Sequence, residues 1–123
     1  MSAHRPTEIR LRRKSRSLEL TFEDGASFAL PAEYLRVHSP SAEVRGHGPG
    51  QEVLQVGKEH VGIAAVEPVG QYAIRIVFDD GHDTGLYSWD YLYDLGANQP
   101  ARWQRYLDRL AAAGHARRDA ESS

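Results

Sequence analysis

The sequence predicts an α+β fold, in which two repeated hairpin-plus-short-helix units build an antiparallel sheet and a C-terminal helix packs on it. The main observation is an internal repeat: residues 18–25 are echoed by residues 74–81, and residues 30–35 by residues 87–92. Residues 18–25 and 74–81 both have apolar residues two apart, then an aromatic residue, two acids and a glycine. Period-two alternation that ends in Asp-Gly is a strong short-range signal for a β-hairpin. Apolar residues three and four apart near the C-terminus add a helix.

The first unit contains two predicted strands and a short helix. Residues 18–22 alternate apolar and polar side chains, so one face of this strand is buried. The chain turns at Gly25, because glycine accepts a positive φ without steric cost, and it returns over residues 27–30. Pro31 suits the first turn of the helix predicted for residues 32–36.

The second unit follows the same order. Residues 60–66 contain enough β-branched residues for a middle strand that joins the two units. Residues 72–78 form the clearest strand of the chain, and residues 84–87 form its return strand. The hydroxyl of Ser88 can cap the next helix, which we expect to end near Gly96.

Two further segments complete the prediction. Residues 37–50 are expected to be a loop, because three glycines and a proline fall within residues 46–50. Asn98 and Pro100 open the last helix, which stops at Gly114. Its apolar stripe has helical spacing and consists of Trp103, Tyr106, Leu107 and Leu110.

Composition limits the classes of protein that fit. A length of 123 residues suits one domain, which we place at residues 8–113, with flexible ends at residues 1–7 and 115–123. The absence of cysteine excludes disulfides and thiolate metal sites. A formal net charge of -2 does not favour nucleic-acid binding. No apolar run approaches the ~20 residues of a membrane span, so we expect a cytoplasmic protein without membrane contact.

The predicted edge strand over residues 8–16 carries a run of basic side chains. These are Arg10, Arg12, Arg13, Lys14 and Arg16. Charges on an edge strand discourage pairing with another chain, which is the simpler interpretation. The alternative is a docking strip for phosphate or an acidic partner, or a surface for self-association.

Residues 82–92 are the segment richest in chemically useful side chains. Three aromatic residues, Tyr87, Trp89 and Tyr91, either form an exposed contact patch or pack in the core with their polar atoms toward water. His82 follows the second hairpin turn, where the first unit has Ala26. A difference inside a repeat is a better candidate for function than the residues that the copies share.

His82 has two interpretations. It can ligate a metal through a neutral imidazole nitrogen, or it is an exposed turn residue. If the units pack as a pseudo-symmetric pair, His38 and His47 of the loop can approach it, with Asp83 as a nearby carboxylate. The spacing of these residues matches no zinc motif.

The sequence contains no catalytic signature. There is no phosphate-binding P-loop and no nucleophile elbow. The paired acids that end at Asp24 and Asp80 are explained by hairpin turns. We therefore rank an enzyme below a binding module.

Several segments together resemble the gamma-butyrobetaine hydroxylase-like N-terminal domain family. The resemblance extends over residues 8–113 and lies mainly in residues 30–43, 46–51, 67–70 and 80–92, the last being the most specific. It implies a domain that occurs alone in bacteria, ahead of the catalytic domain of iron- and 2-oxoglutarate-dependent carnitine-pathway hydroxylases, and as an appendage on P-loop ATPases that carry iron–sulfur clusters.

The resemblance also bears on metal binding. In the related hydroxylases it implies a structural zinc held by three cysteines and one histidine. His82 matches that histidine, whereas the cysteines would fall near Ser39, Ser41 and Val44. Serine and valine cannot replace thiolates, so we expect the zinc site to be lost. A chain of 123 residues cannot also hold the oxygenase domain, so we expect no oxygenase activity.

We therefore expect a non-catalytic binding module that docks a protein partner, linked to iron–sulfur or iron-enzyme maturation. Its contact surface is predicted to combine residues 38–51, including His47, with His82, Tyr87, Trp89 and Tyr91. The alternative is a metal-binding accessory domain with a single metal ion at His82, completed by His38 or His47.

Overall fold

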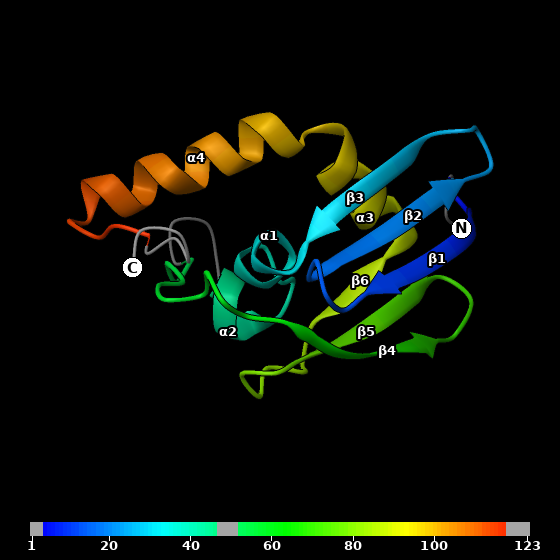
Figure 1. Ribbon diagram of the computed structural model, residues 1–123, viewed down its shortest axis with the longest axis horizontal. Helices are drawn as coiled ribbons and strands as arrows, with labels where there is room; N and C mark the ends of the chain where they lie inside the picture. Colours follow the sequence, from blue (N-terminus) through cyan, green and yellow to red (C-terminus); the bar gives the residue numbers. More distant parts are fainter. Residues whose placement is uncertain (1–3, 47–51, 118–123) are drawn as a thin grey trace.

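The computed structural model describes residues 4–46 and 52–117 and has the predicted α+β fold (Figure 1). The strands form two three-stranded antiparallel sheets, with strand orders β1-β2-β3 and β4-β5-β6. We expected the strands to form one antiparallel sheet, whereas the structure has two smaller antiparallel sheets. Arg13 links them, since its guanidinium donates to the backbone carbonyls of Ile63 and Ala64.

Each unit of the repeat consists of three strands and a helix. The first unit comprises β1 (Pro6–Arg12), β2 (Ser17–Phe22), β3 (Ser27–Pro31) and α1 (Ala32–Val37). The second unit comprises β4 (Ile63–Val69), β5 (Ala73–Phe78), β6 (Leu86–Ser88) and α3 (Trp89–Ala97). The predicted middle strand, β4, is therefore the second unit's counterpart of β1, and the repeat is longer than the sequence echo.

The two hairpin turns have the same hydrogen bonds. The N–H of Phe22 donates to the carbonyl of Ala26 at 2.8 Å, and the N–H of Phe78 donates to that of His82 at 2.9 Å. Gly25 and Gly81 have φ of 88° and 91°, in the region that favours glycine. The predicted Asp-Gly turns are confirmed.

The helices exchange contacts between the units. The Tyr34 hydroxyl of α1 donates to the carbonyl of Leu95 at 2.6 Å, and the Tyr91 hydroxyl of α3 donates to the carbonyl of His38 at 2.5 Å. Tyr91 occupies the repeat position of Tyr34, and Leu95 that of His38, so the two bonds are reciprocal. The units therefore pack as a pseudo-symmetric pair, which is the condition under which the loop after α1 can approach His82.

The core lies between the units. The inward residues of β2 and β5 are at most 2% exposed, which confirms their predicted alternation; they are Leu18, Leu20, Phe22, Ile74, Ile76 and Phe78. Close packing of α3 on β3 requires a glycine, because a Cβ added at Gly96 would lie 2.3 Å from the Phe28 ring. Ser88 caps α3 as predicted, since its hydroxyl accepts from the N–H of Tyr91 at 3.1 Å.

The last helix, α4 (Gln99–Ala112), covers a second, smaller apolar cluster. Tyr106 and Leu110 are buried against Val37 of α1, with Trp103 and Leu107 partly buried beside them, which confirms the predicted stripe. In Figure 1, α4 runs along the side of the molecule on which α1 and α2 lie.

Three local predictions differ from the structure. The predicted loop over residues 37–50 contains a short helix, α2 (Ala42–Arg45), which ends just before the glycine-rich stretch. The prediction that residues 1–7 are flexible is wrong for the described residues 4–7. β1 begins at Pro6, and the His4 ring stacks on the Tyr93 ring with 3.7 Å between the ring centroids. The predicted flexible end at residues 115–123 is held at Arg117, whose guanidinium donates twice to the Glu33 carboxylate, at 2.6 and 2.7 Å.

Across residues 4–46 and 52–117, no helix is both long and apolar enough to cross a lipid bilayer.

Candidate functional site

His82 is buried at the interface of the two units, with only 6% of the residue exposed. Its Nε2 lies 2.8 Å from the hydroxyl oxygen of Ser39 and 3.3 Å from that of Ser41. Its Nδ1 lies 3.2 Å from a carboxylate oxygen of Glu43, at the start of α2. We call these four residues the His82 cluster. The interpretation of His82 as an exposed turn residue is therefore wrong.

The cluster brings together positions that the sequence marked separately. Ser39 and Ser41 stand near the places where the related hydroxylases are expected to carry zinc-binding cysteines, and both hydroxyls point at the His82 ring. Val44, near the third such place, is 6% exposed in α2. In this chain, oxygen atoms and an apolar side chain stand at these positions. Hydroxyl oxygens and an apolar side chain are poor substitutes for the thiolates that zinc prefers.

The hydrogen bonds define the protonation of the ring. A carboxylate can only accept, so Nδ1 carries the proton toward Glu43 and Nε2 accepts from the Ser39 hydroxyl. Burial lowers the pKa of His82, and the positive charge of Arg36 lowers it further, while the Glu43 and Asp80 carboxylates act in the opposite direction. The net pKa is lowered, so the ring is neutral at neutral pH.

Ser39, His82 and Glu43 have the connectivity of a hydroxyl–imidazole–carboxylate triad. No nucleophile–base pair could be named from the sequence, whereas the fold brings the Ser39 hydroxyl and the His82 ring into contact. Ser39 is 0% exposed, however, so a substrate has no access to its hydroxyl in this conformation. In this conformation the three side chains form a buried hydrogen-bond network.

The backbone at Gly85 closes the cluster. A Cβ added at this residue would lie 2.4 Å from the Ser39 hydroxyl oxygen, and 3.2 and 3.3 Å from atoms of Tyr87 and Pro40. Gly85 does not have a positive φ, so space and not backbone conformation requires the glycine. The glycine therefore lets the backbone just before β6 approach Ser39 closely enough to cover it.

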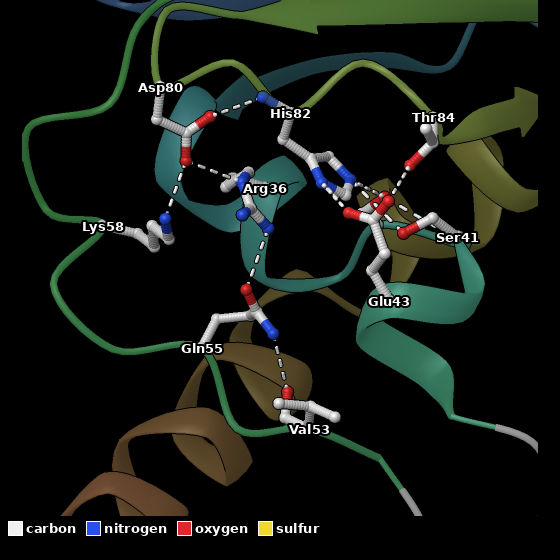
Figure 2. A network of polar contacts seen from close by, with 10 residues as sticks. Arg36, Ser41, Glu43, Val53, Gln55, Lys58, Asp80, His82 and Thr84 are labelled. Carbon is white, nitrogen blue, oxygen red and sulfur yellow. Dashed lines mark hydrogen bonds and ion pairs between the residues drawn. The ribbon is translucent and has the colours of Figure 1, made fainter.

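Asp80 connects the His82 cluster to the segment that follows residue 51 (Figure 2). Its carboxylate accepts from the N–H of His82, from Arg36 at 2.9 Å and from Lys58 at 2.8 Å. Partial burial raises the pKa of Asp80, but the bonds from Lys58, His82 and Arg36 outweigh this effect and lower it to about 2. Arg36 also donates to the side chain of Gln55, so the network holds residues 55–58 against α1.

The histidines predicted as metal ligands do not gather at one point in the described part of the chain. The Nδ1 of His38 lies 2.9 Å from the carbonyl of Tyr34, and the His38 ring packs on the Tyr34 ring. His47 lies outside the described residues. Within residues 4–46 and 52–117, no three His, Asp or Glu side chains converge as a metal site requires.

The predicted exposure of two aromatic residues is wrong. Tyr87 is 0% exposed and its hydroxyl donates to the carbonyl of Leu35; Trp89 is 9% exposed and its indole N–H donates to the carbonyl of Gln71. Both side chains satisfy their polar atoms internally, so they belong to the core and not to a contact patch. Tyr91 is only partly buried and lines a pocket, so its role in partner contact stays a prediction.

This pocket has a volume of about 530 Å³ and lies between α2, residues 52–55 and α4. Its apolar wall is formed by Val37, Val44, Val53, Leu54 and Tyr106. Four arginines also line it: Arg45, Arg102, Arg105 and Arg109. Sequence reasoning missed these arginines because it followed only the apolar stripe of α4. The signal was present, since Arg102, Arg105 and Arg109 have the spacing i, i+3 and i+7 of one helix face.

Comparison with known proteins identifies the family. The model of gamma-butyrobetaine hydroxylase-like N-terminal domains matches residues 9–93. The chain belongs to this family. The resemblance that residues 80–92 carry in the sequence is thereby confirmed.

Solved structures of similar proteins have the same fold as this gamma-butyrobetaine hydroxylase-like domain. Two NMR solution structures are 52% and 54% identical, with TM-scores of 0.81 and 0.80; each match covers 94% of this chain, and 91% and 86% of the respective relatives. A crystal structure from Acidithiobacillus ferrooxidans is 41% identical over 75% of this chain and 92% of its own, with a TM-score of 0.63. That relative is described as a protein of unknown function in the DUF971 family. No curated protein matches the chain.

Proposed function

We propose that this family member is a non-catalytic binding module that docks a protein partner in the cytoplasm, in the maturation of iron–sulfur or iron enzymes. The observation that carries the proposal is the surface around the pocket. Val53 and Val56, two residues of one segment, are 53% and 41% exposed, and Val53 lines the concave site. We define the docking face as residues 37–46 and 52–56 with Tyr91 and the arginine-bearing side of α4.

This face overlaps the surface predicted from the sequence. The pocket is lined by Tyr91 and by part of the predicted contact loop, namely His38, Ser39, Val44, Arg45 and Gly46. Tyr87 and Trp89 are buried and do not line it. The network of Asp80, Arg36 and Gln55 fixes the segment that presents Val53 and Val56. A surface that is held in place before binding loses less entropy on docking.

Burial of Ser39 supports a non-catalytic role. Its hydroxyl contacts the possible base His82 but is not exposed to a substrate. The link to iron chemistry rests on the sequence resemblance alone, which implies related domains beside iron-dependent hydroxylases and on ATPases that carry iron–sulfur clusters.

Site-specific photo-crosslinking in cells tests the proposal. A benzoylphenylalanine placed at Val53, on the docking face, should form a defined crosslinked species with another protein. The matched control carries the same group at Ala29, an exposed residue of β3 outside the pocket lining. Equal crosslinking from both positions, or none from either, would contradict a docking face at residues 52–56.

The second candidate is a metal-binding accessory domain, and the His82 cluster is the observation that favours it. The Ser39 and Ser41 hydroxyls face the Nε2 of its imidazole, and the Glu43 carboxylate faces the Nδ1. Elemental analysis of untagged protein, before and after a chelator, separates the candidates. A stoichiometric metal that is lost in His82→Ala would favour this second function.

A further inference from the structure

The pocket of the docking face is strongly basic in a chain that is acidic overall. Among the described residues, four arginines and one carboxylate, that of Glu52, line the pocket, whereas the whole sequence has a formal net charge of -2. Arg45 comes from α2, and the other three arginines come from successive turns of α4. Positive charge is thus concentrated at one concave site by two separate elements.

Most of this charge is not neutralised within the described residues. Arg102 pairs with Asp94. Across residues 4–46 and 52–117, Arg45, Arg105 and Arg109 form no ion pair with a carboxylate. The positive charges of the pocket also act on His38. Burial lowers the pKa of its ring, and the charges of Arg102, Arg109 and Arg105 lower this pKa further. Within the described residues, the charges of Arg45, Arg105 and Arg109 are therefore not neutralised and can bind an external anion.

The rest of the pocket is suited to an apolar group. Val44 and Tyr106 are buried in its wall, and Val53 is exposed at its edge. The Tyr91 ring lies under the guanidinium of Arg45, at 4.8 Å from the ring centroid, which holds this arginine over the pocket. The hydroxyls of Tyr91 and Tyr106 already donate to the carbonyls of His38 and Gln55, so they present their rings and not free donors.

We propose that the partner segment bound here is an acidic peptide with an apolar anchor. Its carboxylates would pair with Arg45, Arg105 and Arg109, and an aliphatic or aromatic side chain between them would enter the pocket. The proposal rests on the proposed function, since it names the chemistry of the partner that docks. Arginine suits this role because its planar guanidinium binds carboxylates through two parallel hydrogen bonds.

An acidic peptide fits these observations better than a nucleic acid. The basic residues surround one pocket of about 530 Å³, and they do not form a long stripe that could follow a phosphate backbone. The exposed apolar side chain at the pocket edge, Val53, would be left without a partner under a phosphate chain. A peptide side chain packs on it and so uses both halves of the site.

The test is a selection from a random peptide-display library on the purified full-length chain, at physiological salt. We expect enriched peptides with several Asp or Glu residues around an aliphatic or aromatic residue. A synthetic peptide of that consensus should bind about tenfold or more weakly to R105Q/R109Q, because charge-assisted hydrogen bonds are lost. Both arginines are exposed, so the variant should keep the fold.

The control variant is R5Q/K14Q, which removes the same charge from exposed residues outside the pocket and should bind like the unaltered chain. Replacing the peptide's acids by amides should also weaken binding about tenfold or more. Enrichment without acidic residues, no enrichment at all, or equal binding by R105Q/R109Q would overturn the proposal. Tighter binding of a single-stranded oligonucleotide than of any acidic peptide would also overturn it.

The two proposals fail separately. A crosslinked partner at Val53 whose contact segment contains no acidic residues would overturn the acidic-peptide proposal and leave the docking function in place. Selected acidic peptides that depend on Arg105 and Arg109, without a cellular partner at Val53, would support the chemistry of the site and contradict the docking function.

Discussion

Replacing Gly85 by alanine tests whether the packing around the His82 cluster matters for stability. The added Cβ would lie 2.4 Å from the Ser39 hydroxyl oxygen, closer than real Cβ atoms approach any atom, so Ser39 or the strand must move. Overpacking in a core costs ~1–3 kcal/mol. If the hydroxyl moves away from His82, a buried nitrogen also loses its best hydrogen bond, for ~1–3 kcal/mol.

Ser41 remains near Nε2 at 3.3 Å, so we take the lower part of the second range and expect a loss of about 3 kcal/mol in the free energy of unfolding. For a domain of this size, such a loss lowers Tm by roughly 10–15 °C. Urea denaturation followed by circular dichroism measures the free energy directly, and an unchanged m-value would show that the unfolding reaction is the same.

A double-mutant cycle separates this clash from other effects of the methyl group. Ser39→Ala alone should cost about 1–2 kcal/mol, because it removes the hydroxyl that His82 uses. In S39A/G85A the clash is gone, and the remaining contacts, 3.2 Å to Tyr87 and 3.3 Å to Pro40, need shifts of only a few tenths of an ångström. The double variant should therefore be more stable than the sum of the single costs predicts, by ~2 kcal/mol. Additive costs, or a Gly85→Ala variant within ~0.5 kcal/mol of the unaltered chain, would refute the reasoning.

Three further predictions concern charge and metal. The pKa of Asp80 is lowered from 3.8 to about 2, so its contribution to stability is present above pH 3.8 and is lost as the pH falls toward 2. After discounting for its partial exposure, we expect the stability difference between the unaltered chain and Asp80→Asn to shrink by ~1 kcal/mol between pH 5 and 2 in urea titrations; a constant difference would contradict this. Burial lowers the pKa of His82, so stability should decline as the pH falls below 6.5, and His82→Asn should lose that part of the slope; identical profiles would contradict it. The variant S39C/S41C/V44C should bind one zinc, which competition with a chromophoric chelator measures, and adding His82→Ala should weaken that binding; no zinc uptake would mean that the cluster does not match the zinc position of the related hydroxylases.

The sequence was sufficient for the repeat, the turns and most of the strands, because these depend on local patterns. Alternation over residues 18–22 and an Asp-Gly turn specify a hairpin with few contributions from elsewhere. The helix α2 escaped the prediction because glycines at residues 46–50 made the whole segment look irregular, although all of them lie after Arg45. The division into two sheets depends on long-range pairing, which local patterns do not specify.

The candidate site was harder to predict, because burial is a property of the assembled units. Tyr87 and Trp89 could have been exposed or buried on composition alone. Their polar atoms are satisfied by the carbonyls of Leu35 and Gln71, which come from other elements. The resemblance did indicate Ser39, Ser41 and His82 as related positions, but only the fold shows that both hydroxyls contact the His82 ring.

The two units close their hairpin turns in the same way but differ at the residue that follows the turn, which is His82 in the second unit. At the first turn, the Asp24 carboxylate accepts from Tyr93 of α3; at the second, Asp80 accepts from Arg36 of α1, and these helix residues occupy equivalent repeat positions. Both turns are thus closed by the helix of the other unit. Only the second turn has a histidine in place of Ala26, and only there do residues 39–43 cover the turn.

The neutral His82 ring joins the turn to the start of α2, which forms one wall of the arginine-lined pocket. Weakening the His82 cluster should therefore disturb the pocket before it disturbs the first unit, and hydrogen exchange of Val44 and Val53 in His82→Asn should report this, because the N–H of Val53 donates to the carbonyl of Val44 at 2.8 Å.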